Sequence, residues 1–223
     1  MDDGIRIAID GPASSGKGTV ARGVAKQLGY AYIDTGAMFR AVALAAEDAG
    51  VDWHDEESVA ALVADLDVGF QWSEGAVEMV VDGRAIAHRI RSERIGGGAS
   101  AVARYPGVRS ALLDLQRSLA QRGGVVMDGR DIGSVVLPDA ELKVYLDASA
   151  DTRAKRRFDE MRHRDPDVTY EAIKAEIQAR DTQDLNRSQA PLVRVPDAVY
   201  VDTSNMTVEQ AVEQILLAAA SRI

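Results

Sequence analysis

A short segment near the start of the chain has the residue types and spacing of a loop that binds phosphate groups. Gly11 to Thr19 read Gly-Pro-Ala-Ser-Ser-Gly-Lys-Gly-Thr, between an apolar run and a helical pattern. The glycines at positions 11 and 16 let the backbone curl, so that several N–H groups point into one concavity at the positive end of a helix. Lys17 supplies a positive charge to the phosphates of a nucleotide. A glycine-rich turn with a stray lysine is the alternative, which the Gly-x-x-x-x-Gly-Lys spacing disfavours.

The position after the lysine departs from the usual pattern of such loops. A serine or threonine commonly stands there and contacts the magnesium ion of the nucleotide. Here Gly18 takes that place and Thr19 follows it. The motif therefore predicts phosphate binding but leaves the hydroxyl contact to magnesium open.

A second candidate site follows an apolar strand. Residues 125–127 lead into Asp128-Gly-Arg-Asp131. Ligands bind at the carboxyl ends of strands in α/β sheets, so Asp128 could order the waters of a magnesium ion or accept a hydrogen bond from a nucleotide. A turn aspartate that satisfies nearby backbone N–H groups is a competing interpretation, stronger for Asp131 than for Asp128.

Two groups of charged residues could hold phosphate, because arginine forms bidentate contacts with it. One group is Arg180, Asp184 and Arg187, spaced for one helical face. The other is Arg153, Arg156 and Arg157, of which Arg153 and Arg157 are spaced for one face. Taken alone, these spacings favour an interpretation as solvent-exposed charges with no binding role. Exposed ion pairs on solvated helix faces are common and contribute only a few tenths of a kcal/mol.

Alternating strands and helices must position these residues. The expected strands are 5–10, 31–34, 125–127, 142–146 and 198–201. The expected helices cover about 20–28, 37–49 and 108–122, ended by Gly29, Gly50 and Gly123, and a last helix begins at Thr207, which forms a capping box with Gln210. Short apolar strands interleaved with helices predict an α/β fold, with a five-stranded, mainly parallel sheet flanked by helices.

Three stretches interrupt this alternation of strands and helices. Residues 67–86 alternate between apolar and polar around turns at Ser73–Gly75 and Asp82-Gly83, which predicts a small antiparallel meander. Residues 153–168 are rich in arginine and look irregular. Gly96–Gly98 fall inside a helical pattern, where each glycine costs about 1 kcal/mol against alanine. They indicate either a loop between two short helices or a pliable hinge.

The bulk composition limits the class of protein. With 223 residues, the chain suits one α/β domain with a small insertion. A net charge of −9 argues against a nucleic-acid or membrane binder, which would be basic. The absence of cysteine excludes disulfides and thiolate chemistry. With no signal peptide or apolar run of membrane-spanning length, we expect a cytoplasmic protein, monomeric by default.

Together these segments resemble the nucleoside-monophosphate kinases, and most closely the bacterial cytidylate kinases. The resemblance covers essentially the whole chain. The segments that carry it are Asp10–Thr19, Asp34-Thr-Gly-Ala-Met-Phe-Arg-Ala41, Asp128–Asp131, Arg153–Arg157, Arg180–Arg187 and Ala190-Pro-Leu192. Lys-Gly-Thr alone would indicate only the broad kinase class, whereas the ordered set is more specific.

The resemblance implies a phosphate-loop core, an inserted monophosphate-binding subdomain made of a small antiparallel sheet and helices, and a short lid. The core would comprise residues 1–35, 104–152 and 169–223, the insertion 36–103 and the lid 153–168. It further implies transfer of the γ-phosphoryl group of ATP to CMP or dCMP, with Mg²⁺.

The family's functional residues carry over position by position. ATP would be bound by Gly11, Pro12, Ala13, Ser14, Ser15, Gly16, Lys17, Gly18, Thr19, Arg153 and Arg157. CMP would be bound by Thr35, Arg40, Ser100, Arg109, Asp128, Arg130, Asp131, Arg180, Asp184 and Arg187. The catalytic residues would be Lys17, Arg130, Arg157 and Arg187, and Thr19 and Asp128 would lie near the metal, through water. Phe39 departs from the family, which commonly has tyrosine there, and Gly96–Gly98 shortly precede the base-reading Ser100.

Three other functions compete with this one. A related kinase could use UMP, AMP or a small metabolite as its acceptor. A switch GTPase would need an Asp-x-x-Gly element and an Asn/Thr-Lys-x-Asp base reader, and the chain contains neither. A non-catalytic regulator would bind ATP without transferring phosphate to a monophosphate.

Overall fold

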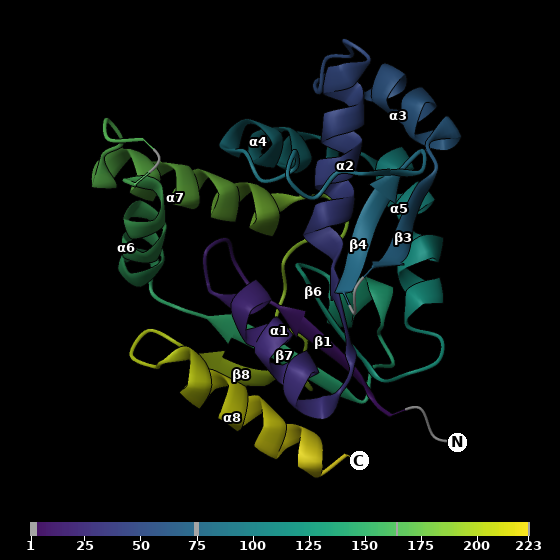
Figure 1. Ribbon diagram of the computed structural model, residues 1–223. Helices are drawn as coiled ribbons and strands as arrows, with labels where there is room; N and C mark the ends of the chain where they lie inside the picture. Colours follow the sequence, from purple (N-terminus) through teal and green to yellow (C-terminus); the bar gives the residue numbers. More distant parts are fainter. Residues whose placement is uncertain (1–3, 74–75, 164, 223) are drawn as a thin grey trace. The chain divides into compact units, whose positions relative to one another are not determined.

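A computed structural model describes residues 4–73, 76–163 and 165–222. The chain divides into two compact units (Figure 1). The first comprises Met1–Ile33 and Arg122–Ile223, and the second comprises Asp34–Gln121.

The first unit is built on a five-stranded sheet in the order β2-β6-β1-β7-β8. Its strands are β1 (Arg6–Asp10), β2 (Ala31–Asp34), β6 (Val125–Gly129), β7 (Leu142–Asp147) and β8 (Val199–Asp202). Strand β1 pairs in parallel with both β6 and β7, and β7 pairs in parallel with β8. The predicted parallel α/β sheet is confirmed, and β1 lies in its middle.

Two helices, α1 (Lys17–Leu28) and α8 (Val208–Ala220), pack on the sheet and form its main hydrophobic core (Figure 1). Ile7, Ile9 and Leu146 of the strands are fully buried in this core. Gly29 ends α1 at φ 69°, and the capping box between Thr207 and Gln210 begins α8, both as predicted.

The arginine-rich stretch expected to be irregular is mostly helical. Helix α6 covers Ala150–Met161, and its N-cap Ser149 accepts a hydrogen bond from the N–H of Thr152. Charged residues hide its periodicity, because only Arg153 and Ala154 of this helix are buried. Ala154 packs against α7 (Tyr170–Asn186). The prediction of an irregular 153–168 segment is therefore wrong over its first half.

The second unit contains the antiparallel meander that the sequence predicts. Strands β3 (Val68–Ser73), β4 (Ala76–Val81) and β5 (Arg84–Ala85) pair in this order. The turn at Asp82-Gly83 has φ angles of 48° and 72°. The turn predicted at Ser73–Gly75 includes residues 74 and 75, which lie outside the described residues.

Four helices complete this unit: α2 (Thr35–Asp48), α3 (Glu56–Asp65), α4 (Glu93–Val102) and α5 (Pro106–Leu119). Two boundaries differ from the prediction. Helix α2 begins at Thr35 because the carboxylate of Asp34 accepts a hydrogen bond from the N–H of Ala37 and caps it. Helix α5 begins with Pro106 and ends at Leu119, before Gly123.

The three consecutive glycines lie inside one continuous helix, α4, so the loop interpretation is wrong. The structure gives Gly98 a packing reason instead. A Cβ at Gly98 would lie 2.6 Å from Cε2 of Trp53, whose ring nitrogen donates a hydrogen bond to the carbonyl of Ala43. Glycine at position 98 therefore lets α4 approach the indole ring.

We expect opposite effects from alanine at two neighbouring positions of α4. Gly98→Ala should lower the free energy of unfolding by about 1–3 kcal/mol, because the methyl group meets a rigid ring. A Cβ at Gly97 would meet no described atom within 4 Å. Gly97→Ala should therefore raise the free energy of unfolding by up to about 1 kcal/mol, through helix propensity. Urea denaturation measures both, and equal shifts of the same sign would contradict the packing argument.

Candidate functional site

The phosphate loop joins β1 to α1, which is the strand–loop–helix context that the motif requires. A Cβ at Gly11 would lie 2.0 Å from the carbonyl oxygen of Leu146, so no other residue fits there. Gly16, the N-cap of α1, has φ 88° and Ser14 has φ 59°, both in the left-handed region. This curl exposes successive backbone N–H groups, as an anion-binding concavity does.

Lys17 opens helix α1 and folds back over the loop. Its side chain is buried, and Nζ donates a hydrogen bond to the carbonyl oxygen of Pro12 at 3.1 Å. The ammonium group is therefore held at the loop itself, as a residue that contacts bound phosphates must be.

Asp10 ends β1 directly before the loop and was not among the predicted site residues. Its carboxylate accepts hydrogen bonds from the N–H groups of Ile132 and Gly133, each at 2.8 Å. These residues begin a short π-helix, η1 (Ile132–Val136), so Asp10 fixes the segment that follows Asp131. Burial raises the pKa of Asp10 to about 6, and the nearby charge of Asp131 acts in the same direction. The two N–H donors and Lys17 oppose the rise.

This buried carboxyl should give the protein a measurable pH dependence of stability. Because the pKa of Asp10 in the folded protein lies above its ordinary value of 3.8, the folded protein holds more protons at Asp10 than the unfolded chain between pH 4 and 6. The free energy of unfolding should then fall as pH rises through this window, by at most about 3 kcal/mol. Asp10→Asn lacks this titration. Urea denaturation of both proteins at several pH values tests it, and parallel pH curves would contradict it.

Asp128 lies at the end of β6, beside the start of α1. It is 6% exposed, and its Oδ1 accepts a hydrogen bond from the hydroxyl of Tyr32 at 2.9 Å. A Cβ at Gly18 would lie 3.9 Å from its Oδ2, so the carboxylate faces the loop as predicted from its place in the strand. Asp131 is also buried, whereas Thr19 is exposed.

The side chains around Asp128 suit a magnesium ion that binds together with a substrate better than a metal ion that is held by protein ligands alone. Magnesium commonly uses one or two carboxylates and completes its shell with water and substrate phosphates. In the described part of the chain, no group of three or more histidine, cysteine, aspartate or glutamate side chains could hold a metal ion. One carboxylate beside a phosphate loop therefore fits a metal that arrives with the nucleotide.

Asp184 of α7 lies between two arginines. Arg130 Nε donates to Asp184 Oδ2 at 2.6 Å, and Arg187 Nη2 lies 3.8 Å from Asp184 Oδ1. The chain turns back after α7, where Leu192 N–H donates to the carbonyl of Asp184, and the Arg187 side chain is only 6% exposed. The interpretation of this group as an exposed helical pair is therefore wrong.

Positive charge gathers around Arg180 of the same helix. Burial lowers the pKa of Arg180, and the neighbouring charges of Arg157 and Arg130 lower it further, while Glu176 and Asp184 oppose the shift. Glu176 forms an ion pair with Arg180 at 2.6 Å. The guanidinium groups of Arg130, which follows β6, and of Arg157 and Arg180 thus come near one another, which favours an anion with several oxygens.

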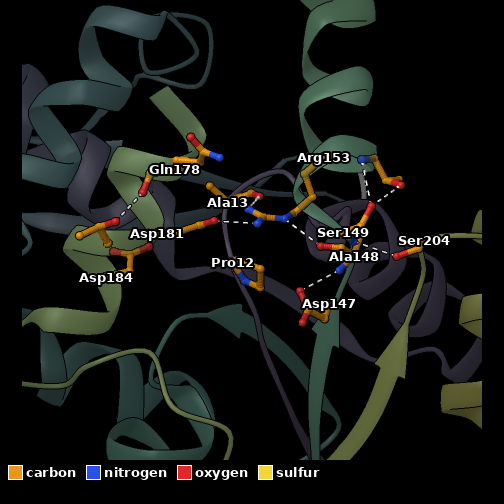
Figure 2. A network of polar contacts seen from close by, with 12 residues as sticks. Pro12, Ala13, Asp147, Ala148, Ser149, Arg153, Gln178, Asp181, Asp184 and Ser204 are labelled. Carbon is orange, nitrogen blue, oxygen red and sulfur yellow. Dashed lines mark hydrogen bonds and ion pairs between the residues drawn. The ribbon is translucent and has the colours of Figure 1, made fainter. Parts of the chain in front are cut away.

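Arg153 and Arg157 both belong to α6, but their side chains lie in different environments. Arg153 is buried, donating to the carbonyl oxygens of Ala148 at 3.0 Å and Ala13 at 3.1 Å and pairing with Asp181 at 2.7 Å (Figure 2). The solvated-face interpretation is therefore wrong for Arg153. Arg157 has a 24% exposed side chain that pairs with Glu160. Direct contacts of either with ATP stay predictions.

The four remaining acceptor-side residues belong to the second unit. Thr35 is buried at the start of α2, and Arg40 pairs with Asp34 at 2.6 Å. Ser100 is half-buried on α4. Arg109 of α5 donates to the carbonyl of Ala103.

Arg109 also contacts the ring of Phe39. The Arg109 guanidinium lies 5.4 Å from the centre of the Phe39 ring, within the range of a cation–π contact. The Phe39 ring therefore supports Arg109 through a contact that needs no hydroxyl. The roles of these residues toward a nucleotide stay predictions.

The chain is similar to known proteins over nearly its whole length. A family model described as Cytidylate kinase matches residues 7–221. The cytidylate kinase of Neisseria gonorrhoeae is 49% identical over 210 residues, which is 94% of each chain. That of Geobacillus kaustophilus is 46% identical over 219 residues, 98% of each chain. A solved shikimate kinase from Acinetobacter baumannii is 17% identical with a TM-score of 0.50, covering 99% of this chain and 95% of its own, and it supports the fold alone.

Proposed function

Because the chain belongs to the cytidylate kinase family, we propose that it transfers the γ-phosphoryl group of ATP to CMP or dCMP, giving CDP or dCDP and ADP. The observation that carries the proposal is the family match, which spans nearly the whole chain. The phosphate loop and the neighbouring arginines Arg130, Arg157 and Arg180 supply the chemistry that such a transfer needs. The protein is thereby a phosphotransferase.

The donor side uses the loop and its lysine. The backbone N–H groups of the loop 11–19, which Pro12 lacks, and the Lys17 ammonium hold the ATP phosphates. Phosphoryl transfer needs mainly positioning and positive charge on the moving group, because its transition state spreads negative charge over the phosphoryl oxygens. Arg130, Arg157 and Arg187 supply that charge. The Arg130–Asp184 contact of 2.6 Å supports this role, since it fixes one guanidinium in place.

The acceptor side reads the base and the phosphate of CMP. We assign the phosphate to Arg40, Arg130 and Arg187, the cytosine edge to Ser100, Arg109 and Asp131, and the ribose to Arg180 and Asp184, with Thr35 nearby. A carboxylate and an arginine satisfy the donor N4 and the acceptors N3 and O2 of cytosine. Uracil reverses the polarity at two of these positions, so buried groups would be left unpaired and UMP would bind poorly.

Mg²⁺ completes the donor site together with ATP. Asp128 and Thr19 would hold it through water, which the buried carboxylate beside Gly18 supports. When bound, the ion neutralises charge on the ATP phosphates. The protein's own contribution is to orient the ion's waters with a carboxylate that Tyr32 fixes.

Initial rates with a panel of monophosphates test the proposed acceptor. Purified protein with ATP and Mg²⁺ should give its highest kcat/KM with CMP or dCMP, well above UMP and AMP. A preference for UMP or AMP would identify the related kinase instead. ATP binding without transfer to any monophosphate would indicate the non-catalytic regulator.

Two further expectations concern the protein as a whole. No helix within the described residues combines the length and the apolar character that crossing a bilayer requires. The monomeric state and the cytoplasmic location expected from the sequence stay proposals, which gel filtration and cell fractionation would test.

A further inference from the structure

Two arginines of α6 donate hydrogen bonds to backbone carbonyl groups of the phosphate loop. Arg153 Nη1 donates to the carbonyl oxygen of Ala13 at 3.1 Å, and Arg156 Nη1 donates to that of Ser15 at 3.2 Å. Figure 2 shows Arg153 between the Ala13 carbonyl and Asp181 of α7. The loop is thus tied through its carbonyl oxygens to the helix that carries Arg157.

A buried threonine supports the second of these contacts. The Arg156 guanidinium donates to Oγ1 of Thr203 at 3.1 Å and to its carbonyl oxygen at 2.7 Å. Thr203 follows β8 and is 3% exposed. Its hydroxyl also lies 3.3 Å from the Ser15 carbonyl oxygen and 3.0 Å from that of Asp147. The single hydroxyl proton of Thr203 is shared between the Asp147 and Ser15 carbonyl oxygens. The Ser15 carbonyl oxygen therefore accepts from Arg156, and Thr203 fixes that guanidinium in place.

Holding a carbonyl also fixes the N–H group of the next residue. In a planar trans peptide, the C=O and N–H groups point in opposite directions. The Ala13 carbonyl therefore aims the N–H of Ser14 away from Arg153. In the same way, the Ser15 carbonyl aims the N–H of Gly16 away from Arg156.

The backbone of the loop needs such support. Ser14 has φ 59°, a left-handed conformation that is uncommon for a residue with a side chain. Strained residues persist only where their surroundings over-determine them. The hydrogen bonds to the carbonyl oxygens of Ala13 and Ser15, the two neighbours of Ser14, hold the backbone in this conformation.

We propose that Arg156 and Thr203, together with Arg153, are positioning residues for nucleotide binding. They orient the N–H groups of Ser14 and Gly16 toward the phosphates without touching the nucleotide. This inference rests on the proposed function, because the loop acts only when ATP binds. It differs for Arg153 from the direct ATP contact that the family resemblance implies.

The test uses variants of graded severity. Thr203→Val removes the hydroxyl and keeps the side-chain shape, whereas Thr203→Ser keeps the hydroxyl. Arg156→Ala removes the whole guanidinium, and Arg156→Lys keeps the charge without the planar fork. Arg162→Ala is the matched control, because Arg162 caps the end of α6 with a 51% exposed side chain paired to Asp159.

We expect Thr203→Val to raise the dissociation constant for ADP and the KM for ATP about five- to tenfold, and Arg156→Ala to raise both at least about tenfold. The KM for CMP should change less than about twofold in both. Thr203→Ser and Arg162→Ala should behave like the unsubstituted protein, with Arg156→Lys in between. Isothermal titration with ADP and initial rates provide these numbers.

Two results would overturn the proposal. One is a lowered melting temperature of Thr203→Val with unchanged ADP affinity, which a merely structural role would give. The other is an equal rise of the KM for ATP and for CMP. Because ADP titration needs no acceptor, it tests the positioning role even if CMP is not phosphorylated. If Arg156→Ala does not fold, the two Thr203 variants decide alone.

Discussion

Lys17→Ala should lower kcat at least about a thousandfold and leave the affinity for CMP nearly unchanged. The ammonium group is buried and held on the phosphate loop by the Pro12 carbonyl, so solvent or another side chain cannot easily replace it. Its charge acts on the transferring phosphoryl group, while CMP is bound by other residues. Initial rates at saturating ATP and CMP, with CMP titration of the free protein, measure both quantities.

Lys26→Ala is the control for this variant, because Lys26 is an exposed lysine in the last turn of the same helix. It should retain full activity. Normal turnover of Lys17→Ala would remove the phosphate loop from the mechanism, and a parallel loss in both variants would point to a damaged helix instead.

Arg187→Ala should weaken acceptor binding and turnover together, raising the KM for CMP about tenfold and lowering kcat about a hundredfold. The Arg187 side chain is almost fully buried beside Asp184, so its guanidinium is fixed before substrate arrives. A fixed guanidinium can grip the acceptor phosphate and stabilise charge as transfer proceeds. Steady-state kinetics with varied CMP at saturating ATP separate the two effects.

Arg194→Ala provides the matched control, since Arg194 lies in the same segment after α7 but stacks over the ring of Tyr200 at 4.9 Å. Arg187→Lys should fall between the two, because lysine keeps the charge and loses the bidentate fork. An unchanged KM for CMP in Arg187→Ala would indicate that Arg187 has a structural role only.

The arrangement around α6 explains why an arginine-rich segment need not be a solvated surface. Arg153 is held by Asp181 and by two carbonyl groups, so its burial leaves the charge paired and hydrogen-bonded. Arginine alone offers enough donors in one plane for such a site. A pattern of charges on a helix therefore does not reveal which of them face the protein.

The features that depend on neighbouring residues could be predicted from the amino-acid sequence. The phosphate loop follows from the spacing of Gly11, Gly16 and Lys17, because the curl of a loop needs glycines within a few residues of one another. The parallel sheet follows from short apolar strands between helices, and the capping box of Thr207 from a four-residue pattern. These elements could be predicted because their physics is local.

The contacts between distant segments became known from the folded structure alone. Asp10 binds the N–H of Ile132 122 residues away, and Arg156 reaches Ser15 over 141 residues. The glycine at position 98 is explained by Trp53, and the burial of Arg187 by the return of the chain at Leu192. Hydrophobic periodicity carries no information about which polar partners folding brings together, since that depends on the packing of whole elements.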